Sequence, residues 1–348
     1  MLVSDFDFDL PEELVAQQPA PERDRSRLLV VDRAAGTFTD AVFGEIGRWL
    51  EAGDLLVVND TRVFPARLVG RREPSGGRVE LFLVREEEDG VWEALARPAA
   101  RVRPGETVVF GEGEQRIEAD VVERRDGGRR AVRFREYDRF WERLDVWGRT
   151  PLPPYIRRAA SEDARLDRDR YQTVYARERG AIAAPTAGLH FTPVLLDELA
   201  AKGVERAAVT LHVGYGTFQP VRVDVVEEHR VEPEMYEIGP AAAEAVAAAR
   251  AEGRRVVAVG TTTTRALESA TSEIGRLAAG RGVAELFIYP GYRFRTVDAL
   301  VTNFHLPRSS LLMLVAAFAG HELILDAYRH AVRERYRFYS YGDAMLIV

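Results

Sequence analysis

The sequence predicts an α/β protein, in which a mixed, largely parallel sheet domain with helices carries an inserted small β-barrel domain. At 348 residues the chain is too long for one ordinary core. Apolar runs alternate with amphipathic segments in residues 1–64 and 150–348, which favours a parallel sheet. Residues 65–149 instead hold short alternating runs between glycine-containing turns, which favours a barrel or sandwich. We therefore expect a discontinuous α/β domain of residues 1–64 and 150–348 and a barrel domain of residues 65–149.

Composition and charge limit the class of protein. Hydrophobic residues make up 46% of the chain and charged residues 30%, and the formal net charge is −7. This balance disfavours generic coating of nucleic acid but allows one local basic patch. The absence of cysteine excludes disulfides, cysteine-ligated zinc and thiol catalysis. The longest apolar run, residues 311–319, is shorter than the ~18 residues of a membrane span. With no signal peptide visible, we expect a cytoplasmic protein without membrane association.

The first α/β segment contains two predicted strands, residues 27–32 and 54–58. Asp40 is predicted to cap a helix between them. A polar cluster that includes Asp60 and Arg62 follows the second strand directly. Such a cluster at the carboxyl end of a strand is either a turn or part of a binding site.

The inserted segment and the second α/β segment each contain further elements. Barrel strands are predicted at residues 78–84, 91–95, 106–110, 116–122 and 130–134. In the second α/β segment, strands are predicted at residues 181–184, 206–213, 255–260 and 284–288. Helices are predicted after Thr192, over residues 240–251, after Ser309 or Ser310, and over residues 322–335.

Polar clusters follow four of the predicted strands. They are Asp60 to Arg62, Thr186 to His190, His212 to Thr217, and Thr261 to Arg265. Parallel strands place their carboxyl ends at one edge of the sheet, where open α/β sheets bind ligands. Each cluster alone is as well explained by a turn, but four together favour a shared site. The helix start after His190 supplies a positive field, which disfavours a protonated imidazole and keeps this histidine neutral.

An arginine-rich loop follows the stiff segment 151–156. Its arginines precede Tyr171 and Tyr175, and such neighbours can hold an RNA backbone and stack bases. A solvated charged loop is the alternative interpretation. The arginines that we predict to contact RNA are Arg157, Arg158, Arg165, Arg168 and Arg170.

Long runs in a fixed order extend over nearly the whole chain. They are residues 16–19, 26–29, 53–62, 65–67, 151–156, 171–176, 184–192, 211–214, 216–218, 267–269, 287–291, 302–307 and 336–347. In these runs the chain resembles the S-adenosylmethionine:tRNA ribosyltransferase-isomerase family of queuosine biosynthesis. One run departs from the family pattern His-x-Met-His-x-Glu, because Glu232 replaces the second histidine, whereas His229 and Glu234 are kept. The turn Thr261 to Arg265 keeps the hydroxyls and the arginine of the family's Thr-Thr-Ser-Val-Arg.

The resemblance implies a reaction. The ribosyl part of S-adenosylmethionine moves to the aminomethyl group of a 7-deazaguanine at the tRNA wobble position and rearranges. The product is epoxyqueuosine, and adenine and methionine are released. The resemblance also implies tRNA as partner, S-adenosylmethionine as co-substrate, no bound cofactor or metal, and a monomer. This chemistry needs a base for a C5′ proton, an acid for the departing adenine, and an RNA base splayed from its loop.

These needs lead to a set of predicted site residues. His190, His212 and His305 are predicted to transfer protons. The residues predicted to bind substrate polar groups are Asp60, Arg62, Thr186, Thr217, Thr261, Arg265, Asn303, Tyr341 and Asp343. A structural role in a turn or in the core is the alternative for each of them.

Two other classes of function stay open. An S-adenosylmethionine-dependent tRNA methyltransferase would release S-adenosylhomocysteine, and usually has a glycine-rich loop after its first strand, which this sequence lacks. A non-catalytic RNA-binding module would bind S-adenosylmethionine without turnover.

Overall fold

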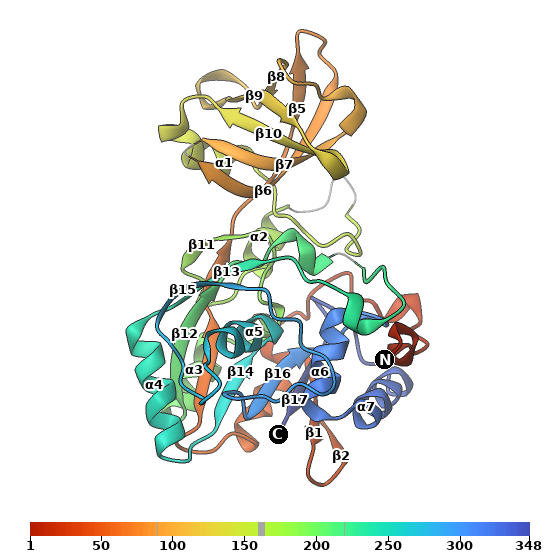
Figure 1. Ribbon diagram of the computed structural model, residues 1–348, viewed down its shortest axis with the longest axis vertical. Helices are drawn as coiled ribbons and strands as arrows, with labels where there is room; N and C mark the ends of the chain where they lie inside the picture. The colour runs from red at the N-terminus through yellow and green to blue at the C-terminus, as the bar shows by residue number, and fades with distance from the viewer. Residues whose placement is uncertain (89, 159–163, 219) are drawn as a thin grey trace.

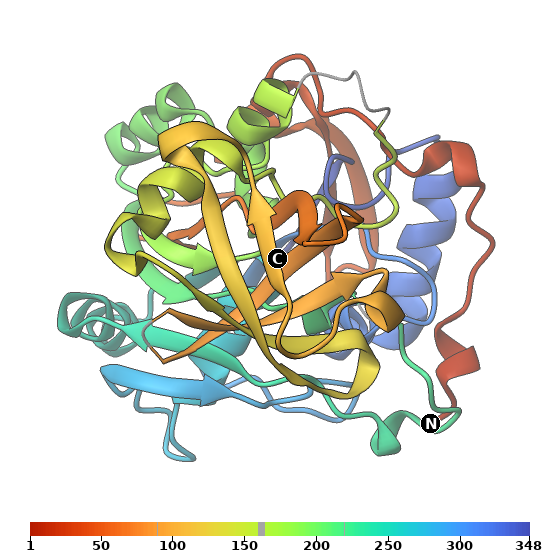
Figure 2. The ribbon, with the colours of Figure 1, turned by 90° about the horizontal axis from the view of Figure 1, so that it is seen from above.

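The computed structural model describes residues 1–88, 90–158, 164–218 and 220–348 (Figure 1). Two parts lie along its long axis, a sheet with helices and, beyond it, a barrel. In Figure 2, a view down this axis, the barrel lies in front of the sheet, so the two parts are stacked along the axis. The predicted fold class, a mixed sheet domain with an inserted barrel, is confirmed.

The main sheet has nine strands. In spatial order they are β15 (Gly280–Ala284), β13 (Glu234–Ile238), β12 (Glu205–Leu211), β3 (Leu55–Asn59), β14 (Val256–Val259), β16 (Ala299–Asn303), β17 (Ala344–Ile347), β1 (Arg27–Asp32) and β2 (Thr37–Val42). The central strands β12, β3, β14 and β16 are parallel, so their carboxyl ends share one edge. Strand β17 pairs antiparallel with β16 and parallel with β1.

Helices cover both faces of this sheet. They are α3 (Pro193–Ala201), α4 (Pro240–Ala251), α5 (Thr261–Ala270), α6 (Ser310–Ala319) and α7 (His321–Arg333). Leu55 and Val57 of β3 point to the face packed by α4, α5, α6 and α7. The alternate residues Leu56 and Val58 point to the face packed by α3 and the 3-10 helix Phe43–Arg48. This alternation buries both faces of the strand, as a parallel sheet requires.

The barrel is closed by six antiparallel strands. They are β5 (Arg67–Glu73), β6 (Arg78–Glu88), β7 (Val91–Arg97), β8 (Thr107–Phe110), β9 (Ile117–Arg124) and β10 (Arg129–Phe134). Helix α1 (Phe140–Trp147) packs against it. Gly111 has φ +73°, and a Cβ there would lie 2.2 Å from the Trp147 ring, so only glycine fits. The five predicted barrel strands are confirmed.

A narrow neck joins the two parts. Strand β4 (Thr61–Val63) leads towards the barrel, β11 (Glu178–Ala181) follows the return, and the two pair in parallel. Helix α2 (Ala164–Arg170) lies beside them (Figure 1). A backbone bridge between Arg67 and Arg149 joins the segments that enter and leave the barrel.

Three predicted elements are wrong in position. Asp40 lies in strand β2 rather than at a helix N-cap, because pairing with β1 outweighs its capping propensity. The strand predicted at 181–184 is β11, which ends at Ala181 and belongs to the small neck sheet. The strand predicted at 284–288 is β15, which ends at Ala284, because the following residues line a cavity instead.

One further finding concerns helix length. Across the described ranges no single helix is long and apolar enough to cross a membrane. Helices α6 and α7 reach that length and apolar composition only when taken together, and they are bent by 116° where they meet.

Candidate functional site

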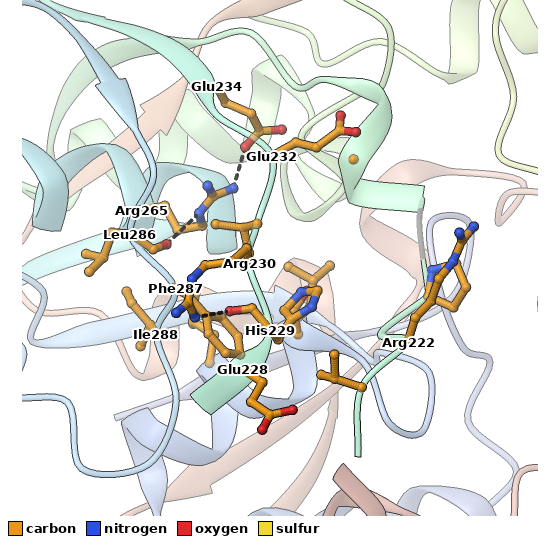
Figure 3. A pocket seen from close by; sticks show the side chains of 17 residues that line it. Arg222, Glu228, His229, Arg230, Glu232, Glu234, Arg265, Leu286, Phe287 and Ile288 are labelled. Atoms are coloured by element: carbon orange, nitrogen blue, oxygen red, sulfur yellow. Dashed lines mark hydrogen bonds and ion pairs between the residues drawn. The ribbon is translucent and has the colours of Figure 1, made fainter. Parts of the chain in front are cut away.

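Two cavities adjoin at Leu311 of α6. The strand-edge cavity, of about 50 Å³, lies at the carboxyl ends of β14 and β16. Its lining includes Tyr155, Tyr171, Thr186, Thr261, Thr262, Asn303, His305 and Tyr339. The loop cavity, of about 240 Å³, is shown in Figure 3. Its lining includes Arg222, Glu228, His229, Arg230, Glu232, Glu234, Arg265 and Phe287.

Asn303, at the end of β16, organises the strand-edge cavity. Its Oδ1 accepts a hydrogen bond from the hydroxyl of Thr186 (2.8 Å), and its Nδ2 donates to Nε2 of His190 (3.0 Å). Asn303 is buried. The amide therefore fixes the segment 186–190 against the sheet, and two predicted substrate contacts, Thr186 and Asn303, lie together.

His190 lies behind Asn303 and outside the lining of both cavities. Its Nδ1 is 2.7 Å from the hydroxyl of Ser26. Burial, together with Arg337 and Arg23, lowers its pKa to about 3, so the ring is neutral at ordinary pH. The predicted neutrality agrees with this shift, but desolvation rather than a helix field is its main cause.

His305 lines the strand-edge cavity. Its Nε2 lies 2.9 Å from the Thr302 hydroxyl, and its backbone N–H donates to the Tyr328 hydroxyl (3.0 Å). Burial lowers the pKa of His305 to about 3. The ring is therefore neutral at ordinary pH and fixed at the wall of the cavity, where a bound substrate would contact it.

His212 follows β12 and lies outside the lining of both cavities. Its Nδ1 is 2.8 Å from the Thr61 hydroxyl. A Cβ on Gly180 would lie 2.6 Å from the ring, so the neck strand β11 packs directly on it. Burial lowers the pKa of His212. The histidine thus joins β12 to the neck.

Asp60 and Arg62 also belong to the neck. Asp60 accepts a hydrogen bond from Thr210 (2.6 Å) and pairs with Arg177 (3.0 Å). Arg62 is exposed and lines a separate cavity of about 250 Å³ beside the neck, which Arg168 also lines. Neither residue reaches the strand-edge cavity or the loop cavity.

The start of α5 closes one side of the strand-edge cavity. Gly260 has φ +94°, which lets the chain turn sharply from β14 into the helix. Thr261 and Thr262 line the cavity at this helix N-terminus, which favours negative ligand groups. Tyr155 and Tyr339 form an edge-to-face ring pair (3.8 Å between centroids) at the same cavity. The site therefore combines hydroxyls, a positive dipole end and aromatic walls.

Arg265 of α5 lies in the wall of the loop cavity and forms a buried ion pair with Glu234 (Figure 3). Glu234 Oε1 also accepts from the backbone N–H of Gly214 (2.9 Å), and Arg265 Nη2 donates to the carbonyl of Ala284 (2.8 Å). The two charges are 9% and 4% exposed, so each stabilises the other in the wall.

The loop cavity contains residues that were not among the predicted site residues. His229 packs edge to face on Phe287 (5.0 Å between centroids), and burial followed by Arg230 lowers its pKa. Glu228 and Glu232 line the same cavity. The family pattern over residues 229–234 was the signal that could have identified them.

Two predicted substrate contacts, Tyr341 and Asp343, are not found in either cavity. The Tyr341 hydroxyl donates to Asp167 (3.0 Å). Asp343 accepts from the backbone N–H groups of Arg27 (3.0 Å) and Arg337 (2.8 Å). The side chain of Thr217 lies outside the part of the chain that the structure describes.

The predicted RNA contacts divide into two groups. Arg158 pairs with Asp167 (2.8 Å) and donates to the carbonyl of Gln17 (2.7 Å), and Arg170 donates to the carbonyls of Ala20 and Pro21, so both hold the N-terminal segment. Arg157 and Arg168 are exposed, with side chains 80% and 54% accessible. The side chain of Arg165 lies outside the described residues.

No metal site is evident in the described ranges, since they hold no cluster of three or more His, Asp or Glu side chains able to bind an ion. The fold and the site together define a class: a two-part α/β protein with an inserted barrel and paired cavities beside the carboxyl edge of its parallel strands. The chain matches the family model described as queuosine biosynthesis protein over residues 3–347, and it belongs to that family.

Relatives match over their full length. Proteins named S-adenosylmethionine:tRNA ribosyltransferase-isomerase from Geobacter metallireducens and Syntrophotalea carbinolica are each 55% identical, covering 100% of both chains. The protein of that name from Symbiobacterium thermophilum is 52% identical with the same coverage. A crystal structure of S-adenosylmethionine tRNA ribosyltransferase from Thermotoga maritima is 40% identical, covers 99% of this chain and 100% of its own, and has a TM-score of 0.55.

Proposed function

We propose that the protein transfers and isomerises the ribosyl moiety of S-adenosylmethionine onto 7-aminomethyl-7-deazaguanine at the tRNA wobble position. The products are epoxyqueuosine-tRNA, adenine and methionine. The observation that carries this proposal is 55% identity over the full length to proteins named for this activity. A polar cavity at the carboxyl edge of the sheet supports it, because that is where such folds bind their ligands.

S-adenosylmethionine binds at the strand-edge cavity and extends into the adjoining loop cavity, because the strand-edge cavity of about 50 Å³ is too small to hold it alone, and the RNA base enters through the loop cavity. Thr186, Thr261 and Asn303 supply hydroxyl and amide groups for the ribose and the methionine. The N-terminus of α5 suits the methionine carboxylate. Tyr155 and Tyr339 offer ring surface for the adenine. Because the cavities adjoin at Leu311, the ribose lies where the two substrates meet.

Proton transfer is assigned first to His305, because it lines the cavity and is neutral. His229 is the second histidine that lines a cavity. His190 positions Asn303 through a hydrogen bond (3.0 Å). The earlier prediction that His190 and His212 transfer protons remains to be tested by substitution.

The enzyme works as a cytoplasmic monomer with no resident cofactor or metal and without membrane association. The absence of cysteine, which excludes disulfides and cysteine-ligated metal, supports the cytoplasmic and metal-free parts of this proposal. Light scattering and metal analysis of the active protein would test it.

Residues 65–149 form a separate domain within an α/β domain of residues 1–64 and 150–348. The core of the barrel, which is distinct from the two sheet cores, supports this division. Circular dichroism and thermal melting of residues 65–149 expressed alone would test it, and an unfolded fragment would contradict it.

The deciding experiment incubates the protein with S-adenosylmethionine and tRNA that carries the aminomethyl base. Adenine, methionine and the modified nucleoside are measured by mass spectrometry. We expect all three in equal amounts. Release of S-adenosylhomocysteine would instead indicate a methyltransferase, and binding without turnover would indicate an RNA-binding module.

A further inference from the structure

Glu232 stands at the wall of the loop cavity, next to the buried Arg265–Glu234 pair (Figure 3). Its side chain packs on Gly216, where a Cβ would lie 2.6 Å from the Cβ of Glu232. Any larger residue at Gly216 would displace the carboxylate. The turn that follows β12 therefore packs against the side chain of Glu232 and limits where it can move.

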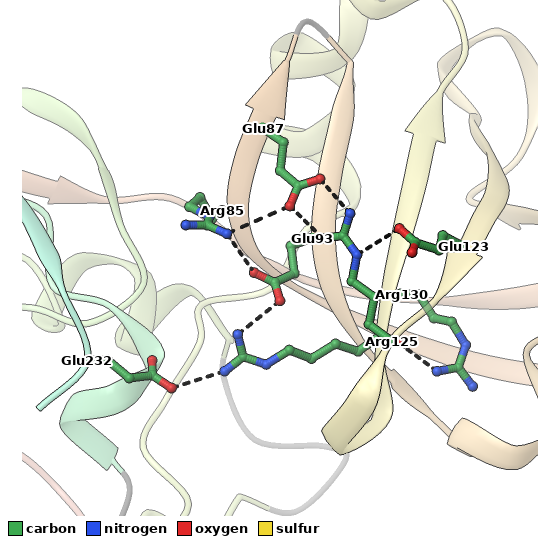
Figure 4. Close-up of polar contacts among 8 residues, drawn as sticks. Arg85, Glu87, Glu93, Glu123, Arg125, Arg130 and Glu232 are labelled. Atoms are coloured by element: carbon green, nitrogen blue, oxygen red, sulfur yellow. Dashed lines mark hydrogen bonds and ion pairs between the residues drawn. The ribbon is translucent and has the colours of Figure 1, made fainter. Parts of the chain in front are cut away.

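On its other side Glu232 contacts the barrel. Arg129, the first residue of β10, donates from Nη2 to Glu232 Oε1 (3.0 Å) and from Nη1 to Glu93 Oε1 (2.9 Å). Glu93 is a buried barrel residue, 7% exposed, and pairs also with Arg85 (3.4 Å). Figure 4 shows Glu232 at one end of a chain of contacts that continues through Glu93 to Arg85 and Glu87. The planar guanidinium thus joins one carboxylate from each part of the molecule.

A second contact reaches the same wall from the barrel. The ring of Tyr215, next to Gly216, packs edge to face on Phe82 of β6 (5.7 Å between centroids). The covalent connections of the barrel run through the neck strands β4 and β11. A connection through the neck alone would let the barrel rotate relative to the sheet. The contacts of Arg129 with Glu232 and of Phe82 with Tyr215 lie at a second place and therefore fix the orientation of the barrel.

We propose that Glu232 is a positioning residue, which together with Arg129 fixes the barrel against the wall of the loop cavity and so sets the shape of that cavity for the incoming RNA base. The inference rests on the proposed function for its substrate. The side chains of Arg129 and Glu232 are 26% and 38% exposed, so their ion pair is partly shielded from solvent.

A double-mutant cycle tests the pair. Glu232→Gln, Arg129→Gln and the double variant are compared for kcat and for KM towards tRNA and S-adenosylmethionine. We expect each single substitution to lower kcat/KM for tRNA about tenfold, and the double variant to be no worse than Arg129→Gln, because both single substitutions break the Arg129–Glu232 contact and Arg129→Gln also removes the contact with Glu93. Arg129→Lys keeps the charge and should retain more activity than Arg129→Gln. KM for S-adenosylmethionine should change little.

Two outcomes would overturn the proposal. Losses that multiply in the double variant would mean that the residues act independently. Loss of kcat with Glu232→Gln alone, while Arg129→Gln stays active, would mean that Glu232 touches the substrate instead.

Arg133→Gln is the matched control, because Arg133 lies on the same strand and its partner Glu88 belongs to the barrel, both well exposed (54% and 65%). Hydrogen exchange of residues 211–216 provides a readout without turnover. Exchange there should be faster in Glu232→Gln and Arg129→Gln and unchanged in Arg133→Gln. Unchanged exchange in all three variants refutes the positioning role. An inactive wild-type protein, in contrast, refutes only the proposed function, because the exchange result still decides the pair.

Discussion

The strand-edge cavity and the loop cavity adjoin but are built differently. The strand-edge cavity is formed by the ends of β14 and β16 and the start of α5, so its walls continue the hydrophobic core. The loop cavity is formed largely by residues 220–234 and 286–288, and charged pairs hold its walls. One site is thus fixed by packing and the other by electrostatics, and substitutions should separate these two kinds of support.

His305→Ala should have the largest effect, because it removes the histidine at the strand-edge cavity. We expect single-turnover conversion to fall by about 10²–10⁴-fold, the usual contribution of general acid–base catalysis, with much smaller changes in substrate binding. Rapid-quench assays of adenine release would measure it.

His190→Ala is the comparison for this variant, because His190 is equally buried but lies behind Asn303. A smaller loss is expected there. An equal or larger loss in a folded protein would return proton transfer to His190, as the sequence alone predicts.

Arg265→Gln should test the electrostatic support of the loop cavity. Removing one partner of a buried ion pair leaves Glu234 unpaired, at a cost of about 3–5 kcal/mol in the free energy of unfolding. Urea titration measures the change. Glu237→Gln is the control, since Glu237 lies on the same strand as Glu234 but its ion pair with Arg281 is exposed (78% and 51%), and its loss should cost at most about 1 kcal/mol. Equal costs would mean that the buried pair contributes no more than an exposed one.

Acid should weaken the packing around the strand-edge cavity. Burial lowers the pKa of His305 and of His190 to about 3, whereas an unfolded histidine titrates near about 6.5. The unfolded chain therefore binds more protons as the pH falls below about 6.5, so stability is full above that pH and declines towards pH 3. Each histidine should account for about 2 kcal/mol lost between about pH 7 and pH 5.

His305→Gln removes one of these titrating groups, so its stability should depend less on pH by that amount. Urea titrations of the variant and the wild type at the two pH values would show it. Parallel pH dependences would refute the assignment.

The smallest effect is expected from the exposed arginines, which touch neither cavity. Arg168→Ala should weaken tRNA binding slightly and lower the slope of log affinity against log salt by about 1, with S-adenosylmethionine binding unchanged. Arg158→Ala serves as contrast, because Arg158 pairs with buried Asp167 and its loss should lower stability. Identical salt slopes for Arg168→Ala and wild type would remove Arg168 from the interface.

Local patterns in the sequence identified the strand-edge site better than the loop site. Apolar runs predicted β3, β12 and β14, and parallel pairing then brought Thr261 close to the cavity that Asn303 and His305 line. Asp60 and His212 were also predicted at this site and also follow strands that end at the same edge. Their side chains point towards the neck instead of the cavity, and a sequence pattern does not show in which direction a side chain points after a strand ends.

The loop cavity depends on contacts between distant segments. The wall that holds Glu232 is defined by Arg129 from the barrel, and no periodicity links these two residues. Strands β13, β16 and β17 were missed for a related reason, because pairing with neighbouring strands rather than the pattern of their own residues favours a strand there. Long-range pairing therefore accounts for most of what the sequence did not reveal.

The position of β17 inside the main sheet has a consequence for how the chain folds during synthesis. Leu28 of β1 pairs with Ala344 of β17, so the hairpin of β1 and β2 cannot join the sheet until nearly the whole chain is available. Every strand pair of the barrel, in contrast, lies within residues 67–134. The barrel can therefore form while the rest of the chain is still being synthesised. The hairpin of β1 and β2, in contrast, stays apart from the sheet, with its hydrophobic residues exposed, until β17 has been made.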